Sequence, residues 1–105
     1  MEAKFDFGEV MTTKSISYHE KNNPAFHNEI VDCFQRHISC DFGIVCKEDK
    51  EANLEDIKNN EGRILSRYKT SQGDIYINTQ MEAYDFKNNK PIFKKITMIM
   101  FCEEY

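Results

Sequence analysis

The spacing of the apolar residues changes along this chain, and that change is the strongest constraint on its fold. From residue 24 to about residue 39 apolar residues recur at intervals of three and four, as they do on one face of an α-helix. Asn22, Asn23 and Pro24 predict the helix start, because an Asn side chain caps free N–H groups and proline needs no partner in the first turn. The apolar face of this helix is expected to hold Phe26, Ile30, Cys33, Phe34, His37 and Ile38.

A second helix is expected from about Lys47 to Asn59. This segment is rich in helix formers, and its acidic residues at the front suit the positive end of the helix dipole. Gly62 is expected to end it. Its apolar residues are few, so we expect a surface helix with a narrow buried seam. The seam would consist of Ala52, Leu54 and Ile57.

Alternation with a period of two, which is typical of strands, dominates the second half of the chain. Residues 63–68 alternate in this way, and after the turn "SQG" a second strand resumes at residue 75, which predicts a hairpin. A second hairpin is expected within residues 81–102, with Asn88 and Asn89 at its turn, Pro91 at an edge, and the apolar segment "ITMIMFC" as the last strand. Residues 5–13 predict a short strand bent at Gly8, followed by a polar stretch.

Helices followed by antiparallel strands indicate an α+β domain. We expect two layers, with two or three helices on one face of a small antiparallel sheet of three to five strands. The 105 residues suffice for a single domain with one core, carrying an inserted basic hairpin at residues 84–95. No apolar run is long enough to cross a bilayer, and the first residues lack the basic start and apolar stretch of a signal peptide. A cytoplasmic monomer or homodimer with reduced cysteines and no membrane partner is therefore expected.

Charge is distributed unevenly along the chain, which has a formal net charge of −4. Residues 47–61 hold six acidic residues and three lysines, so this acidic segment is a candidate surface for binding a partner. Its carboxylates could also hold a divalent ion, although a solvated helix face explains them more simply. The candidate residues are Glu48, Asp49, Glu51, Glu55 and Asp56.

Residues 84–95 have the opposite character, with four lysines and one aspartate interleaved with aromatic residues. Such a surface can hold phosphates and stack on bases, or insert into a groove of another protein. Edge strands also carry lysines simply to prevent aggregation. The candidate residues of this basic hairpin are Tyr84, Phe86, Lys87, Lys90, Phe93, Lys94 and Lys95.

The segment "RHISCDFGIVCKEDKEAN", residues 36–53, spans the junction of the two predicted helices and carries residue types that can form a metal site. Cys33, His37, Cys40 and Cys46 could meet around zinc, but their spacing matches no zinc finger or ribbon, and buried cysteines are common. Cys33 and His37 could instead form a catalytic dyad, although both lie on the predicted core face. We therefore predict no metal and no cofactor.

The "DFG" triplet in the same segment is shared with protein kinases, but a kinase needs far more chain than this one offers. A structural role explains the triplet better. Asp41 would cap or turn the chain, Phe42 would fill the core, and Gly43 would permit an unusual backbone angle.

Several short motifs occur in a characteristic order: Arg36-His37, "DFG" at 41–43, "KEDKEAN" at 47–53, "GRILSRY" at 62–68, "DIYIN" at 74–78, and "FCEEY" at the end. This order resembles a family of small proteins carried by bacterial plasmids, integrative elements and phages. Cys40 stands where the family has glycine, Phe42 replaces tryptophan, and residues 84–95 look like an insertion. The motif residues expected to be structural are Asp41, Phe42, Gly43, Asn53, Arg63, Ser66, Tyr68 and Tyr105.

The resemblance implies a counter-defence role, since small acidic proteins of this origin resemble anti-CRISPR inhibitors. The expected function is thus non-enzymatic binding to a host Cas nuclease, with its nucleic-acid-binding surface blocked. The alternative is an accessory protein that binds nucleic acid through the basic hairpin. A small metal-dependent or cysteine enzyme is a third class.

Overall fold

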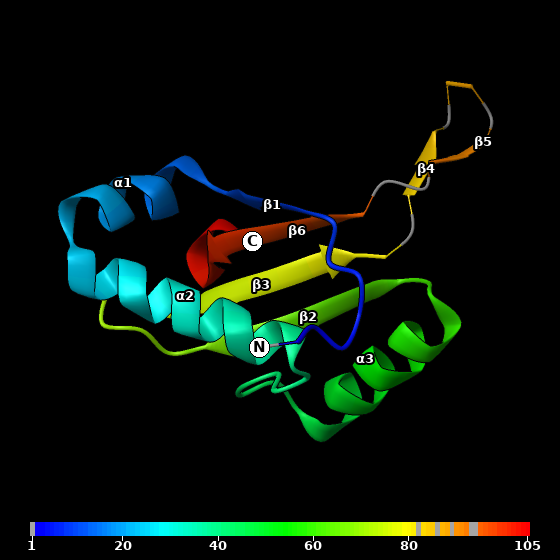
Figure 1. Cartoon of the computed structure of the whole chain (residues 1–105), viewed down its shortest axis with the longest axis horizontal. Coiled ribbons are helices and arrows are strands. Elements are labelled where there is room, and N and C mark those ends of the chain that lie inside the picture. The colour runs from blue at the N-terminus through cyan, green and yellow to red at the C-terminus, as the bar shows by residue number, and fades with distance from the viewer. Residues whose placement is uncertain (1, 82, 86, 89, 93–94) are drawn as a thin grey trace.

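A computed structural model describes residues 2–81, 83–85, 87–88, 90–92 and 95–105 (Figure 1). Three α-helices, six strands and a final 3₁₀ helix lie in these ranges. In chain order they are β1 (Glu9–Thr12), α1 (Lys14–Asn22), α2 (Pro24–Ile38), α3 (Lys47–Asn59), β2 (Arg63–Tyr68), β3 (Ile75–Gln80), β4 (Ala83–Asp85), β5 (Lys90–Ile92), β6 (Ile96–Phe101) and η1 (Cys102–Glu104).

The α+β class is confirmed, with helices layered on a four-stranded sheet of order β1-β6-β3-β2. Strands β2, β3 and β6 are antiparallel neighbours, as expected. The sheet is mixed rather than wholly antiparallel, because β1 adds to it in parallel with β6. Strands β4 and β5 form a separate two-stranded hairpin that projects from the end of the main sheet (Figure 1).

Helix α2 begins and ends close to where the sequence predicts. The Asn23 side chain accepts a hydrogen bond from the Phe26 backbone N–H at 3.2 Å, and Pro24 occupies the first turn. Helix α1 was not expected, because residues 14–22 were predicted to be a polar connection. Its only buried residue is Ile16, so its apolar pattern is very weak, and its N-cap is the Thr13 side chain.

Helix α3 has the predicted bounds, but its predicted seam is wrong. Ala52 and Leu54 are exposed, and only Ile57 of the three is partly buried. The buried residue of the helix is Asn53. The reason is that α3 lies along the edge of β2, where backbone hydrogen-bonding groups must be satisfied, rather than on an apolar face.

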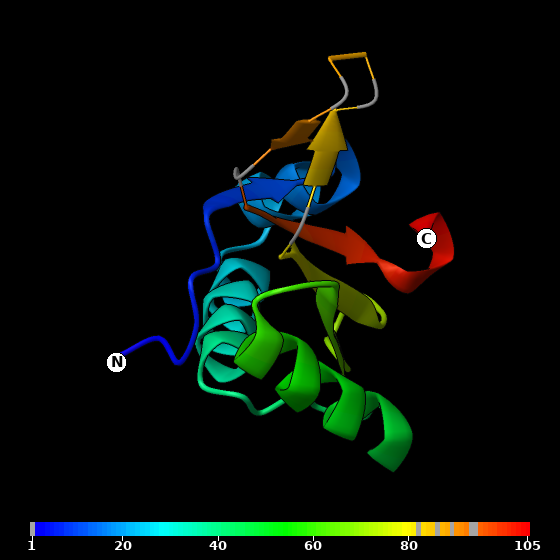
Figure 2. The ribbon, with the colours of Figure 1, turned by 90° about the vertical axis from the view of Figure 1, so that its right-hand side faces the viewer.

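One face of the sheet forms the core, with α1 and α2 packed against it (Figure 2). Alternate residues of each central strand point into this core, including Ile64, Ile77 and Ile99. The opposite face is not covered by any α-helix of the described chain, and most side chains of its three inner strands are half-buried there. None of the helices described here combines the length and apolar character required to span a bilayer.

Candidate interaction surfaces

The segment that joins α2 to α3 is held by a hydrogen-bonded turn around Asp41. The Asp41 carboxylate accepts a hydrogen bond from Arg36 Nε at 2.7 Å and another from the Gly43 N–H at 3.3 Å. Tyr68 O–H donates to the Asp41 carbonyl at 2.5 Å. The bonded Arg36 guanidinium lowers the pKa of the Asp41 carboxyl. Asp41 is therefore an acceptor for its own turn, as the structural interpretation of the "DFG" triplet expects.

The other two residues of the triplet attach this segment to strand β2. Phe42 is buried in the core. Gly43 forms a parallel bridge with Arg67, in which the Arg67 N–H donates to the Phe42 carbonyl and the Ile44 N–H donates to the Arg67 carbonyl. Gly43 has φ +73°, and a Cβ atom there would lie 2.0 Å from the Arg67 carbonyl oxygen. Only glycine fits this position without a shift of the backbone.

Cys40 also adopts a left-handed backbone, with φ +67°. All four cysteines are free. Burial raises the pKa of the Cys33 thiol to about 11, so Cys33 is a protonated core residue near neutral pH. Within the described ranges no three or more His, Cys, Asp and Glu residues form a group that could hold a metal ion.

The buried histidine of α2 joins a chain of hydrogen bonds that crosses the core. His37 Nδ1 lies 2.6 Å from Ser66 Oγ, and His37 Nε2 lies 2.9 Å from Thr79 Oγ1. Thr79 Oγ1 lies 2.6 Å from Thr97 Oγ1, which donates to the Phe7 carbonyl at 2.7 Å. This series of hydrogen bonds therefore connects α2 to three strands of the sheet and to the N-terminal segment.

The donor and acceptor of each hydrogen bond in this series follow from its last acceptor, the Phe7 carbonyl. Thr97 uses its only proton on the Phe7 carbonyl, so Thr79 must donate to Thr97 and accept from His37 Nε2–H. A neutral His37 then accepts from Ser66 through Nδ1. Burial lowers the pKa of His37 to about 4, which favours this neutral form. Ser66 and His37 are each 0% exposed, so both ends of this hydrogen bond lie inside the core.

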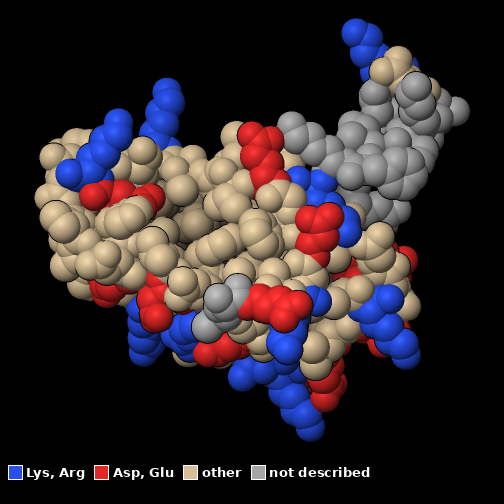
Figure 3. Space-filling view, in the orientation of Figure 1, with Lys and Arg blue, Asp and Glu red and all other residues tan. Residues whose placement is uncertain are grey.

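The acidic segment is an exposed face of α3. Glu48, Asp49, Glu51 and Glu55 are all exposed. Asp56 differs from them, since it is partly buried and its carboxylate accepts a hydrogen bond from the Arg63 N–H at 3.3 Å. Lysines are interleaved with the carboxylates, including Lys47 at 3.9 Å from Glu51, and Figure 3 shows both signs of charge around this helix.

The anchor of α3 is the buried Asn53. Its Nδ2 donates to the Leu65 carbonyl at 2.8 Å, and its Oδ1 accepts from the Leu65 N–H at 3.1 Å. The amide thus pairs with β2 as a neighbouring strand would. Because Asn53 attaches α3 to β2 in this way, the side of the helix that faces away from β2 is fixed.

The basic hairpin is described only in part. Phe86, Phe93 and Lys94 lie outside the described residues, and for Tyr84 and Lys90 the strand pairing alone is described. Lys87 is exposed. Lys95 is not available as a surface cation, because its side chain is 15% exposed, donates to Asn60 Oδ1 at 2.5 Å and lies 3.9 Å from Asp6.

An aromatic and cationic row on the open face of the sheet was missed by the sequence analysis. The Arg67 guanidinium lies 5.6 Å from the Tyr76 ring centre, and the Tyr76 ring lies 5.0 Å from that of Tyr105. The Arg63 guanidinium lies 5.9 Å from the Tyr105 ring and donates a hydrogen bond to its hydroxyl. The position of Tyr76 could have been predicted, because alternation along β3 directs it to the face opposite to that of the buried Ile75 and Ile77. Tyr105 joins the row only through the tertiary structure.

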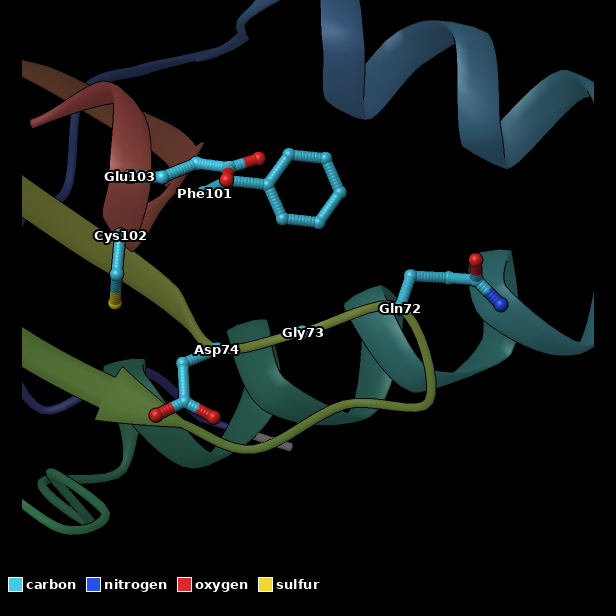
Figure 4. A pocket seen from close by; sticks show the side chains of 6 residues that line it. All are labelled: Gln72, Gly73, Asp74, Phe101, Cys102 and Glu103. Atoms are coloured by element: carbon cyan, nitrogen blue, oxygen red, sulfur yellow. The ribbon is translucent and has the colours of Figure 1, made fainter.

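A small cavity of about 230 Å³ lies beside the turn between β2 and β3 (Figure 4). It is lined by Gln72, Gly73, Asp74, Phe101, Cys102 and Glu103. The Asp74 carboxylate is already bonded to Arg67 at 2.8 Å, and burial raises the pKa of the Cys102 thiol. The lining side chains point in different directions in Figure 4, so no set of functional groups converges on a ligand.

No family model, no curated protein and no solved structure matches this chain.

Proposed function

We propose that this protein acts by binding another macromolecule rather than by catalysis, and that α3 contacts the nucleic-acid-binding groove of a host enzyme. The observation that supports this proposal is the stripe formed by Glu48, Glu51 and Glu55. These residues are spaced three and four apart, so they share one side of the helix, and all three are exposed. Asn53, which is bonded to β2, faces a different side.

The stripe suits an Arg- and Lys-lined groove on electrostatic grounds. The helical rise separates the three carboxylates by about 4.5 and 6 Å along the axis, so negative charge recurs along a line as it does in a phosphate backbone. A helix that is already fixed to a sheet edge loses little conformational freedom on binding. The carboxylates can therefore compete with phosphates for the same cations.

The motif resemblance supplies the class of target. Small mobile-element proteins of the similar family resemble anti-CRISPR inhibitors, so we propose a Cas nuclease as the partner and occlusion of its nucleic-acid surface as the mechanism. The alternative, direct nucleic-acid binding by the basic hairpin, depends on residues of which several lie outside the described ranges.

The test is cleavage of a labelled DNA target by a panel of purified Cas nucleases, with and without the protein. We expect inhibition of at least one nuclease, and at least a tenfold loss of potency when Glu48, Glu51 and Glu55 are all changed to Lys. The matched control reverses three exposed carboxylates elsewhere, Glu2, Asp32 and Glu103, which gives the same change in net charge. Equal loss in both variants, or no inhibition by the wild type, would contradict the proposal. Salt-sensitive binding of DNA alone by the wild type would instead favour the alternative.

A further inference from the structure

Strand β1 is an edge strand that lacks the usual protection. All four of its residues are exposed, with Val10 at 42% and Met11 at 44%. Its sequence, EVMT, contains no proline and no lysine. Exposed apolar edge strands normally carry such residues, because their free backbone groups otherwise pair with other chains. A strand of this kind is expected to have a partner in solution.

The backbone of β1 offers hydrogen bonds in a defined pattern. The Glu9 N–H donates to the Lys95 carbonyl and the Thr13 N–H donates to the Ile99 carbonyl, so the odd-numbered residues bond to β6. In a parallel pair the intervening residues, Val10 and Thr12, direct their N–H and C=O groups away from the neighbouring strand. Neither residue has a hydrogen-bond partner for these groups in the described part of the chain.

We infer that β1 pairs with β1 of a second copy of this chain, antiparallel about a two-fold axis through Met11. In this register Val10 lies opposite Thr12 of the second copy, and the two residues exchange both hydrogen bonds. The symmetry repeats the pair, so four backbone hydrogen bonds form. Met11 faces Met11 of the second copy on the open side of the sheet, beside Met98, which is its neighbour in β6.

Charge along the strand favours its own copy as the partner. Glu9 precedes the apolar residues, and Lys14 follows Thr13 at the other end. Antiparallel pairing brings Glu9 opposite Thr13 and next to Lys14 of the second copy, and the two-fold axis repeats this contact. Parallel pairing would instead place like charges together. A strand whose charges and hydrogen bonds both match under a two-fold axis has the self-complementarity that an isologous interface requires.

The interface is small, so the dimer is expected to be weak. Four residues of edge strand bury far less than the roughly 800 Å² per partner of a standard interface, which suggests a dissociation constant on the order of 100 µM. This inference does not depend on the proposed function, because it concerns a different surface from α3.

Sedimentation velocity of the full chain between about 10 µM and 1 mM tests the inference over the range set by that constant. We expect a monomer at the low end and a dimer at the high end. Met11→Lys should weaken the dimer at least tenfold, because it places two like charges on the axis. Leu54→Lys is the control, with the same charge change at a residue that is 53% exposed on α3. A monomer at every concentration, or a dimer that survives Met11→Lys, would overturn the inference.

Cross-linking gives a second measurement that does not depend on affinity. Met11 and its symmetry mate form a non-hydrogen-bonded pair, in which the Cα atoms are about 4.5 Å apart, so two cysteines there can form a disulfide. We expect Met11→Cys, made together with Cys46→Ser to remove the exposed native thiol, to yield on oxidation at high concentration a peptide in which a disulfide joins position 11 of the two copies. Leu54→Cys in the same background should yield no corresponding peptide. Equal cross-linking of both variants would contradict the proposed register.

Discussion

The two edge strands of the four-stranded sheet, β2 and β1, differ in whether their outward backbone groups have hydrogen-bond partners. Along β2 every second residue directs its backbone outward, and each of these residues has a partner. Arg67 is bonded to the segment around Gly43, Leu65 to the Asn53 side chain, and Arg63 to the Asp56 carboxylate. Along β1 the outward groups of Val10 and Thr12 have no such partner among the described residues.

The difference shows how the chain closes an edge without adding a strand. A bridge, an amide and a carboxylate, all from residues 42–56, replace the missing neighbour of β2. The same residues place α3 at that edge, so the position of its exposed carboxylates depends on these contacts with β2. Nothing comparable covers β1 in the described structure, which is why we assign that edge to a second copy. Four experiments test this contrast, from the largest expected effect to the smallest.

Replacing Gly43 should break the closed edge most severely. Gly43→Ala places a Cβ 2.0 Å from the Arg67 carbonyl oxygen at a residue with φ +73°, so we expect the free energy of unfolding to fall by about 3 kcal/mol or more. Urea denaturation measures the change. Gly73→Ala is the control, since its φ is +116° but no atom lies within 4 Å of the added Cβ. Its cost should be about 1 kcal/mol. Similar losses in both variants would show that the bridge to β2 is not the reason for glycine at position 43.

Acidification should destabilise both edges of the sheet together. The hydrogen bonds through His37 connect Ser66 on β2 to Phe7, just before β1. The pKa of His37 is lowered from 6.5 to about 4, so between these values the unfolded state binds more protons than the folded state. Stability is therefore fully present above about pH 6.5 and decreases as the pH falls towards 4. The total loss should be on the order of 3 kcal/mol.

Urea denaturation at a series of pH values tests this titration. His37→Gln should be less stable than the wild type at pH 7, and its stability should decrease less between pH 6.5 and 4. Carboxylates titrate in both proteins, so the difference between the two curves isolates the imidazole. Parallel curves would show that His37 is not buried in its neutral form.

Removal of the α3 anchor should have an intermediate effect. Asn53→Ala leaves the Leu65 N–H and C=O without partners, so we expect a loss of about 2 kcal/mol and faster hydrogen exchange at the Leu65 amide. Asn59→Ala is the matched control, because Asn59 is exposed and its side chain bonds to Glu55 within the helix. It should change stability by less than about 0.5 kcal/mol. Unchanged exchange at Leu65 in the Asn53 variant would mean that α3 does not close this edge.

The smallest effect is expected at the open edge. Met11→Lys in dilute protein should change the free energy of unfolding by less than about 0.5 kcal/mol, because Met11 is exposed and its backbone bonds do not depend on the side chain. The same substitution should nevertheless abolish dimerisation at high concentration. A loss above about 1 kcal/mol in the monomer would show that β1 is packed rather than open.

Several elements could be predicted because their signals are local. The Asn23 and Pro24 pair marked the start of α2, and intervals of three and four marked its buried face. Alternation marked β2 and β3, and the "SQG" turn between them implied their antiparallel pairing. The unusual backbone angle expected at Gly43 is present, with φ +73°, because a glycine between two helices suggests such an angle whatever lies nearby.

Other features could not be predicted because their partners are distant in the sequence. Helix α1 buries only Ile16, so no apolar period reveals it. Asn53 serves as the anchor of α3 in place of Ala52 and Leu54 because β2, a later element, presents backbone rather than apolar side chains to it. The parallel pairing of β1 with β6 joins segments from opposite ends of the chain.

The sequence by itself determined the kinds of most elements other than α1, the buried face of α2 and of the central strands, and the uneven distribution of charge, because periodicity and capping act over a few residues. Only the tertiary structure decided which polar groups are bonded and which edge remains open. His37, for example, has partners 29 and 42 positions away, and they meet it only through the register of β2 and β3. Hydrogen bonds and edge closure depend on such long-range placement, which no local pattern encodes.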